Sequence, residues 1–295
     1  MIWILISVLA LWLILYVLWK VKSKGAPRTG VPILVYHQVS DSLDWSITRQ
    51  RIKQLERGMR FLYEEGYKTV KLDEMSSFEQ PGDEKKVALT FDDGYEDLYT
   101  DAYPILQKYG FTAHVFIVTG YVGRYNDWDF NWGRNKKKHL DWAQIRELSD
   151  AGFGMGSHTV NHPDLTRTPK PSLDYELRAS KQFLEDKLGR SVDFLSYPFG
   201  RHDRHVEEKA QNAGYKEAYT LCANRKGSLA DRFARQRWAV YLIDSPLTLR
   251  IKLNPGGLFW IEDMKARIIN GFPGWTIALK GSPDYGRLDM APPAR

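Results

Sequence analysis

The run Thr90-Phe91-Asp92-Asp93-Gly94 closes an apolar stretch that begins at Val87. Val87–Phe91 is typical of a buried strand, and two carboxylates at its exit cost desolvation free energy unless they share a cation or a proton. Because side chains alternate along a regular strand, both aspartates face one pocket only if the chain turns at Gly94. In that arrangement one carboxylate binds a metal ion and the other stays free as a base. The alternative is that both cap the following helix.

Seven apolar or β-rich runs of this kind alternate with amphipathic stretches along the chain. The runs are Ile33–His37, Val87–Phe91, His114–Val118, Phe153–His158, Val192–Pro198, Glu217–Leu221 and Trp238–Leu242. The stretches with a helical period are Arg51–Glu65, Asp141–Ala151, Pro171–Leu188 and Arg204–Ala213. This alternation predicts an α/β fold with a parallel sheet. Because the polar signatures cluster at the carboxyl ends of the strands, we expect a distorted (β/α) barrel of about seven strands rather than an open doubly wound sheet.

A pair of histidines follows another of these strands, in the run Ser157-His158-Thr159-Val160-Asn161-His162. His158 and His162 are four residues apart, so on a helical turn they share one face and chelate one ion. Such a pair is weak evidence alone, but an aspartate pair follows a second strand. Two imidazoles and one carboxylate leave open positions on zinc or a similar divalent ion, where a water molecule can be activated for attack on a carbonyl.

The amino-terminal residues predict a membrane anchor. Ile2 to Trp19 carry no charge and nearly span the hydrocarbon core of a bilayer, so residues 1–19 are expected to form a transmembrane helix. A cleaved signal peptide is the alternative, but no basic segment precedes the run and no small-x-small site follows it directly. Residues 20–30 form a basic linker that contains Lys20, Lys22, Lys24 and Arg28, and the positive-inside rule places this linker in the cytoplasm.

Composition narrows the choice of partners and sites. The net charge is +6 and the basic residues are spread along the chain, so we expect no nucleic-acid binding. The single cysteine, Cys222, excludes an intrachain disulfide framework and a cysteine-based zinc site.

The motifs Thr90–Gly94, Ser157–His162 and Ser196-Tyr197-Pro198-Phe199-Gly200, in this order and spacing, resemble those of polysaccharide deacetylases of the NodB-homology type, carbohydrate esterase family four. The resemblance covers roughly Val31 to Lys252 and implies a distorted β/α barrel that removes N- or O-acetyl groups from sugars with the help of a metal. It implies that Asp92 is the general base and that Asp93, His158 and His162 bind the metal, most often zinc, with cobalt or nickel as alternatives. The backbone N–H of Phe199 would help to hold the oxyanion, with Tyr197 and Pro198 beside the substrate.

Two departures from the family pattern affect these roles. Ser196 stands where the family often has an arginine that orients the base, so either another arginine substitutes for it or the base is less constrained. We expect Arg237 to substitute. The alternatives are that Arg235 does so, or that Arg237 is a plain surface or helix-facing residue. The usual carboxyl-terminal Leu-x-His is missing, because no histidine follows His205. Instead, the early run Pro32–His37 resembles the rearranged motif order of biofilm poly-N-acetylglucosamine deacetylases, in which the early strand carries the catalytic acid. The resemblance therefore assigns that role to His37.

Two segments outside these motifs complete the predicted organisation. The loop from Tyr121 to Trp132 is rich in aromatic residues, and Trp128 and Trp132 are expected to stack on sugar rings, although a packed lid is the alternative. Residues 31–254 form the expected catalytic domain and residues 255–295 an appended segment and tail. In that segment Ile261, Met264 and Ile268 fall at helical spacing. This helix either packs on the barrel, which we favour, or lies at the membrane interface.

The predicted function is that of a membrane-anchored, metal-dependent deacetylase that acts on N-acetylated amino-sugar glycans and releases acetate. One alternative keeps the chemistry but acts on a lipid-linked amino sugar. Another is a glycan-binding protein that has kept the site and lost turnover. Family members that trim surface glycans act outside the cytoplasm, which conflicts with the positive-inside signal of the linker.

Overall fold

The computed structural model describes residues 30–42, 46–78, 84–126, 136–221, 231–254 and 259–280, the last ten as backbone only. The predicted anchor, Trp128 and Trp132 lie outside these residues. In the part of the chain that is described, no helix is long and apolar enough to cross a membrane.

Within the described residues, eight parallel strands form the centre of the molecule. They are β1 (Ile33–Tyr36), β2 (Lys68–Thr69), β3 (Lys86–Phe91), β4 (His114–Ile117), β5 (Gly154–Ser157), β6 (Phe194–Ser196), β7 (Glu217–Leu221) and β8 (Arg235–Ala239). Seven of them close into a ring in the order β1-β3-β4-β5-β6-β7-β8, because β1 pairs with both β3 and β8. The predicted parallel barrel of about seven strands is therefore confirmed.

The missed strand, β2, explains why the ring has seven members. It pairs only with Lys86 and Val87 at the start of β3, whereas β1 pairs with β3 from Ala88 to Phe91. Two residues are too few to separate β1 from β3 along their length, so these strands meet directly. The last strand was predicted at Trp238–Leu242 but lies at Arg235–Ala239, because its first half is polar and does not read as an apolar run.

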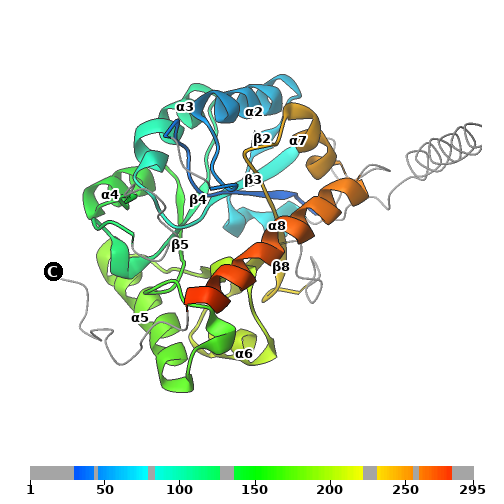
Figure 1. Cartoon of the computed structure of the whole chain (residues 1–295). Coiled ribbons are helices and arrows are strands. Elements are labelled where there is room, and N and C mark those ends of the chain that lie inside the picture. The colour runs from blue at the N-terminus through cyan, green and yellow to red at the C-terminus, as the bar shows by residue number, and fades with distance from the viewer. Residues whose placement is uncertain are drawn as a thin grey trace, which may run out of the picture.

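Helices surround the ring of strands (Figure 1). They are α2 (Ile52–Glu64), α3 (Tyr103–Lys108), α4 (Trp142–Asp150), α5 (Lys170–Leu188), α6 (Arg204–Asn212), α7 (Pro246–Leu253) and α8 (Phe259–Lys280). Shorter helical segments are η1 (Leu72–Phe78), η2 (Leu98–Ala102), η3 (Thr119–Tyr121), η4 (Leu165–Arg167) and η5 (Pro198–Gly200). The side chains of Asp141, Asp203 and Ser245 cap α4, α6 and α7, and Gly189 ends α5 with a left-handed φ of 66°.

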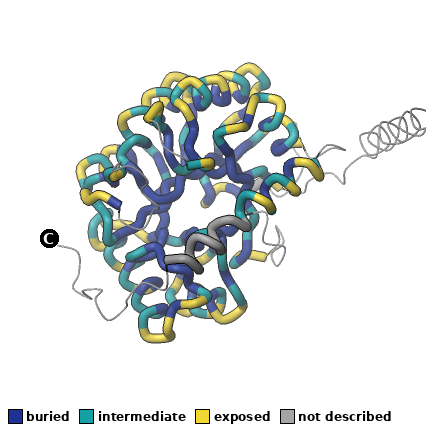
Figure 2. Tube along the Cα trace, in the orientation of Figure 1, coloured by how far each residue is buried: buried dark blue, intermediate teal, exposed yellow. Residues whose placement is uncertain are grey.

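Two layers of apolar side chains, one outside and one inside the ring of strands, hold the barrel together. Buried residues follow the strands, and exposed residues lie at the periphery (Figure 2). Leu34, Leu89 and Val115 point outward and pack beneath the helices. Ile33, Phe116 and other side chains of alternate positions fill the interior. Because the interior is filled, chemistry is confined to the carboxyl-terminal edge of the strands, where the polar motifs lie.

The helix α8 packs against the barrel through both polar and apolar residues. The ring of Phe259 lies 4.6 Å from that of Trp238. The buried Glu262 and the partly buried Lys265 form ion pairs with Lys252 and Asp244. Packing on the barrel was the expected arrangement, but the apolar stripe of Ile261, Met264 and Ile268 does not make the contact and is exposed. The buried charges fix the opposite face of the helix against the barrel.

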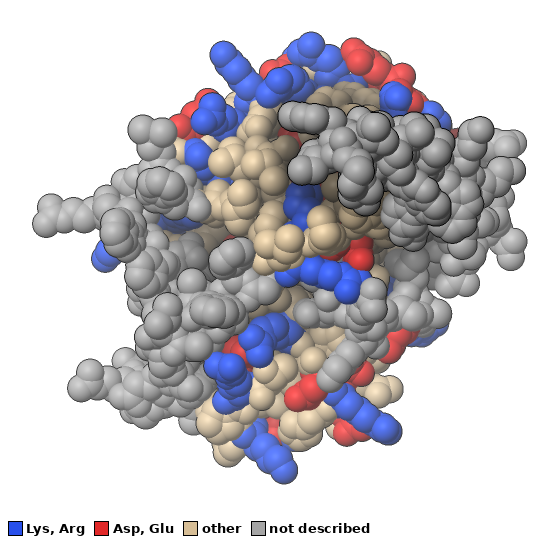
Figure 3. All heavy atoms as spheres, turned by 45° about the vertical axis from the view of Figure 1, so that its right-hand side comes forward, with Lys and Arg blue, Asp and Glu red and all other residues tan. Residues whose placement is uncertain are grey.

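The surface of one face carries charges of both signs. Lys and Arg side chains lie among Asp and Glu side chains over the described residues of that face, without a continuous basic stripe (Figure 3).

Candidate active site

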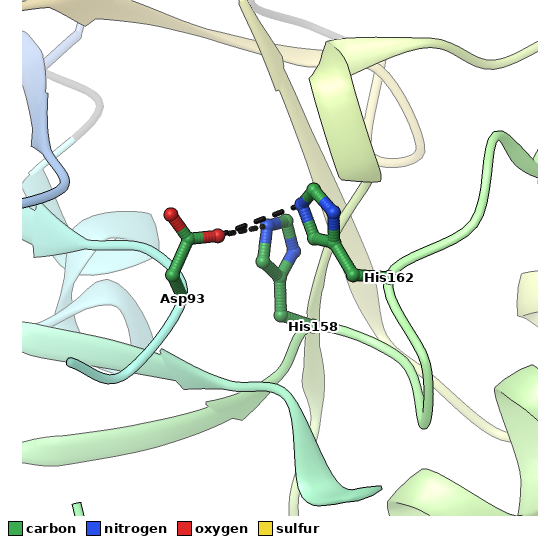
Figure 4. A group of neighbouring side chains, drawn as sticks. All are labelled: Asp93, His158 and His162. Atoms are coloured by element: carbon green, nitrogen blue, oxygen red, sulfur yellow. Dashed lines mark ion pairs between the residues drawn. The ribbon is translucent and has the colours of Figure 1, made fainter. Parts of the chain in front are cut away.

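Asp93, His158 and His162 form a buried cluster at the carboxyl-terminal edge of the barrel, with one ligand atom from each residue within 4.8 Å of the others. Asp93 follows β3, and both histidines follow β5. The Nε2 atoms of His158 and His162 lie 3.4 and 3.5 Å from the same oxygen of Asp93 (Figure 4). Ligands about 2.1 Å from a tetrahedral cation lie about 3.4 Å from one another. The three residues therefore fit a divalent metal ion without rearrangement.

The local backbone turns these ligands inward. Asp93, Thr159 and His162 have left-handed φ angles of 71°, 69° and 56°, which are uncommon for residues with a side chain. The expectation that His158 and His162 share a helical turn is wrong, because the chain after β5 bends through these strained residues and forms no helix before η4. The bend still brings the two rings to a centroid distance of 4.7 Å.

Glu176 of α5 holds this bend in place and was missed by the sequence analysis. Its buried carboxylate accepts hydrogen bonds from the backbone N–H groups of Val160 and Asn161, at 2.8 and 2.9 Å, and from the side-chain amide of Asn161 at 2.8 Å. All three donors lie between the two histidines. The sequence carries one signal for Glu176, because it lies three residues after Leu173 and four before Ser180, on the buried face of α5. The partners of its carboxylate are visible only in the packed structure.

The remaining nitrogen of His158 fixes its ring. Nδ1 lies 2.8 Å from the backbone oxygen of Ser196, which can only accept, so Nδ1 carries the proton and donates it. This tautomer leaves the lone pair of Nε2 directed at Asp93, as a metal ligand requires.

Asp92 is buried beside this cluster and forms a bidentate ion pair with Arg237 of β8. The guanidinium nitrogens lie 2.7 and 2.6 Å from the two carboxylate oxygens, and both residues are at most 3% exposed. The hydroxyl of Ser196 donates to Asp92 at 2.9 Å and accepts from Arg237 at 2.7 Å. The structure thus brings Arg237, rather than Arg235, to Asp92. Arg235 instead pairs with Glu217 at 2.8 Å.

Burial and charge act in opposite directions on the acidic residues of the site. Burial raises the pKa of the Asp92 carboxyl, but the guanidinium of Arg237 and the positive form of His158 outweigh it, so that this pKa lies below its ordinary value. The pKa of Asp93 is also lowered, because hydrogen bonding to His158 and the positive form of His162 outweigh the effect of burial.

The two histidines of the cluster respond differently. Burial, together with the neighbouring His158, lowers the pKa of His162 to about 3, which keeps this imidazole neutral and able to bind a metal. Burial also lowers the pKa of His158, but the hydrogen bond that its protonated form donates from Nε2 to Asp93 outweighs this effect, and the net shift is upward. The neutral form, with its lone pair on Nε2, is the one that can bind a metal ion.

His37 lies at the end of β1, across from Asp92. Tyr36 is in register with Phe91, and the backbone N–H of Asp92 donates to the oxygen of Tyr36 at 2.9 Å. The positive form of His37 lowers the pKa of both Asp92 and Asp93, so its ring lies within electrostatic reach of both carboxylates. Its buried Nδ1 has no hydrogen-bond partner among the described residues. This placement suits a proton donor, a role that stays a prediction.

The motif Ser196–Gly200 contains the short helical turn η5, which lies beside the cluster of Asp93, His158 and His162. Phe199 has a left-handed φ of 58°, and its ring lies 4.6 Å from that of His162. Its role as an oxyanion donor stays a prediction. Tyr197 is 1% exposed, packs in the outer core and donates to the backbone oxygen of Phe233 at 2.9 Å. The strand end thus directs the Tyr197 side chain away from the edge, and the expected contact of this residue with substrate stays a prediction. Pro198 is also buried.

Comparisons with known proteins agree with this site. A family model described as polysaccharide deacetylase matches residues 79–218. The putative polysaccharide deacetylase YxkH of Bacillus subtilis is 31% identical over 193 residues, which make up 64% of each chain. A poly-beta-1,6-N-acetyl-D-glucosamine N-deacetylase of Escherichia coli is 30% identical over 230 residues, 66% of this chain and 34% of that protein. The chain thus spans less than two thirds of the length of both relatives.

Among solved structures, a Streptococcus pyogenes deacetylase, PplD, in complex with acetate is similar with a TM-score of 0.66 and 27% identity, over 78% of this chain and all of that chain. The structure of IcaB from Ammonifex degensii has the same fold, with a TM-score of 0.60 and 21% identity, over 77% of this chain and 97% of the other. The motifs, the barrel and the buried cluster of Asp93, His158 and His162 agree with these similarities, and residues 79–218 match the polysaccharide deacetylase family, as the sequence motifs predicted.

Proposed function

We propose that this chain is a metal-dependent hydrolase that removes N-acetyl groups from amino-sugar glycans and releases acetate. The observation that carries the proposal is the pairing of two different carboxylates at one strand end. Asp93 faces two histidines that can bind a cation with it, whereas Asp92 is held apart by Arg237. Hydrolysis of an amide needs both a site that polarises the carbonyl and a base that activates water.

The residues divide the reaction between them. Asp92 accepts a proton from the attacking water, whose oxygen bonds to the acetyl carbon, while Arg237 and Ser196 keep the carboxylate ionised and oriented. A divalent cation held by Asp93, His158 and His162, zinc by preference with cobalt or nickel as alternatives, would supply polarisation of the carbonyl and a lower pKa for water. The backbone N–H of Phe199 donates to the oxyanion. His37 then donates a proton to the sugar nitrogen as the C–N bond breaks, and acetate leaves.

Acetate release by the full-length chain in detergent tests this proposal. The substrates are N-acetylglucosamine oligomers and a chromogenic acetyl ester, before and after chelation and resupply of zinc, cobalt or nickel. We expect metal-restored release that is lost in His158→Ala and in Asp92→Asn, and that falls sharply in His37→Ala. Asp193→Asn is the matched control, because this carboxylate pairs with Lys216 just before β6, at the opposite edge of the barrel.

Two outcomes would overturn parts of this proposal. If Asp92→Asn retained full acetate release, Asp92 would not be the base. If the wild-type chain bound metal and glycan without releasing acetate from any substrate, the glycan-binding alternative would replace the enzyme.

The same proposal includes the location of the protein. Residues 1–19 would anchor the chain in a membrane, with the catalytic domain on the extracytoplasmic side, where glycan substrates lie. Protease treatment of intact cells and of lysed cells tests this. Cleavage of the catalytic domain in intact cells is the expected result, and protection until lysis would place it in the cytoplasm, as the basic linker indicates.

A further inference from the structure

A cleft opens at the carboxyl-terminal edge of the barrel, the edge that also carries Asp93, His158 and His162. It has a volume of ≈ 540 Å³ and lies between the loops that follow β1, β3 and β4, where Gln38, Ser40, Glu96, Asp97, Tyr125 and Lys138 contribute to its walls. These loops are continuous with the catalytic centre. Gln38 directly follows His37, and Glu96 lies three residues after Asp93. The ring of His139, next to Lys138, contacts the backbone oxygen of Asp93 at 2.9 Å.

The aromatic ring of the cleft is held on a rigid support. Tyr125 and Lys138 form an antiparallel bridge, flanked by hydrogen bonds from the Asn126 N–H to the Lys137 oxygen and from the His139 N–H to the Arg124 oxygen, both at 2.8 Å. Despite this fixed backbone, the side chain of Tyr125 is 56% exposed. An exposed ring beside hydrogen-bonding groups suits the apolar face of a pyranose.

A buried acceptor in the wall also points to a ligand. Gln38 is 4% exposed, and its side-chain oxygen has no hydrogen-bond partner among the described residues. Its backbone is fixed, because the Gln38 oxygen accepts from the N–H of Gln50 at 2.8 Å. A buried carbonyl without a donor is unfavourable. A sugar hydroxyl would supply the missing O–H donor.

The charges in the cleft favour a neutral ligand over an anionic one. The lysines at positions 136, 137 and 138 lie beside Glu96 and Asp97. Lys138 forms an ion pair with Glu96 at 2.7 Å, and the ammonium of Lys137 lies over the ring of Tyr95, 5.5 Å from its centroid. Two of the three cations are thus engaged within the protein, and the surroundings are rich in both donors and acceptors.

We propose that this cleft binds the pyranose residue adjacent to the one that loses its acetyl group. The inference rests on the proposed function and extends it, because it makes the chain an enzyme for oligomeric rather than single sugars. A ligand that fills both the metal site and the cleft gains binding from Tyr125 and Gln38 that a small acetyl ester, confined to the metal site, does not reach.

Kinetics with substrates of increasing length test the cleft in the full-length chain. The probes are β-1,6-linked N-acetylglucosamine oligomers of one to five sugars and a chromogenic acetyl ester. Tyr125→Ala and Gln38→Met should lower kcat/KM for the longer oligomers about tenfold and change that for the ester and the monosaccharide less than about twofold. Tyr63→Ala is the control, because Tyr63 lies on α2 and is similarly exposed, at 60%; it should leave every substrate unchanged.

Each other outcome overturns the inference. Equal losses on the ester and the oligomers would show that the variants damage the catalytic centre, and unchanged kinetics at every length would show that the cleft takes no sugar. If the wild-type chain hydrolyses nothing, the proposed function fails. Calorimetric binding of the pentamer then decides the cleft alone, because it should weaken about tenfold in Tyr125→Ala and not in Tyr63→Ala.

Discussion

Replacing Arg237 by methionine should move the pH dependence of activity and also destabilise the protein. Arg237 is the largest fully buried side chain in the described part of the chain. Its guanidinium donates a hydrogen bond to each carboxylate oxygen of Asp92, at 2.7 and 2.6 Å. Inside the barrel it lies 5.1 Å from the centroid of the Phe116 ring. Methionine fills much of this volume but leaves the carboxylate of Asp92 buried and unpaired.

The expected magnitudes follow from that geometry. Removing one partner of a buried ion pair costs about 3–5 kcal/mol of unfolding free energy. If about 3 kcal/mol of this stabilises ionised Asp92, its pKa rises by about 2 units in Arg237→Met, at 1.36 kcal/mol per unit. The base is then protonated at a higher pH, so the acid limb of the kcat/KM profile for acetate release should move up by about 2 pH units.

The sign of the stability effect can be checked in the same samples. Since the pKa of Asp92 is lowered in the folded protein, its stabilisation is present above the unfolded pKa and is lost as the pH falls. The difference in unfolding free energy between wild type and Arg237→Met should therefore be largest near neutral pH and shrink on acidification. Urea unfolding at a series of pH values measures it.

Arg235→Met provides the matched control on the same strand. Arg235 pairs with Glu217, and both side chains are partly exposed, at 13% and 14%. This variant should leave the acid limb in place and cost less stability. An unchanged acid limb in Arg237→Met, or a shift in Arg235→Met instead, would refute the assignment of Arg237 as the residue that orients the base.

Further predictions concern the metal loop, the barrel interior and a buried phenol. Glu176→Ala removes three hydrogen bonds from the loop that carries both histidines. It should weaken cobalt binding about 10- to 100-fold in a spectroscopic titration, and Glu176→Gln should recover most of this affinity. Asp203→Ala, which removes the cap of α6, is the control and should not weaken cobalt binding. Gly154→Ala places a Cβ 2.0 Å from Nδ1 of His114 and should lower the free energy of unfolding, measured in urea, by about 1–3 kcal/mol. In the control Gly58→Ala the Cβ meets only the tip of Leu249, at 3.1 Å. Equal effects of the two variants would contradict the close packing of His114 against Gly154. Burial raises the pKa of Tyr36 well above its ordinary value. Tyr36→Phe should therefore leave the tyrosinate absorbance gained between about pH 9 and 11.5 unchanged. A loss of one tyrosine's share would show that Tyr36 is accessible.

Much of the fold follows from local patterns in the sequence. Strand positions depend on runs of apolar residues, and all seven predicted strands are present. The clustering of Asp93, His158 and His162 was also predictable, since carboxylates and histidines directly after strands gather at one edge of a parallel barrel. The prediction was less reliable where a strand is polar. The start of β8 was not predicted, because its first three residues, Arg235, Gln236 and Arg237, are polar or charged and do not form an apolar run.

Only the tertiary structure decided how the site is supported. Arg237 and Asp92 are 145 residues apart and meet because β8 pairs with β1, and β1 with β3, in one particular register. Glu176 reaches the histidine loop across the packing of α5 against β5, and left-handed angles at Thr159 and His162 replace the expected helical turn. Local sequence sets which residues can form a strand or bind a metal. The choice of partner for each buried charge depends on the register and closure of the barrel, which are set by the packing of all strands together.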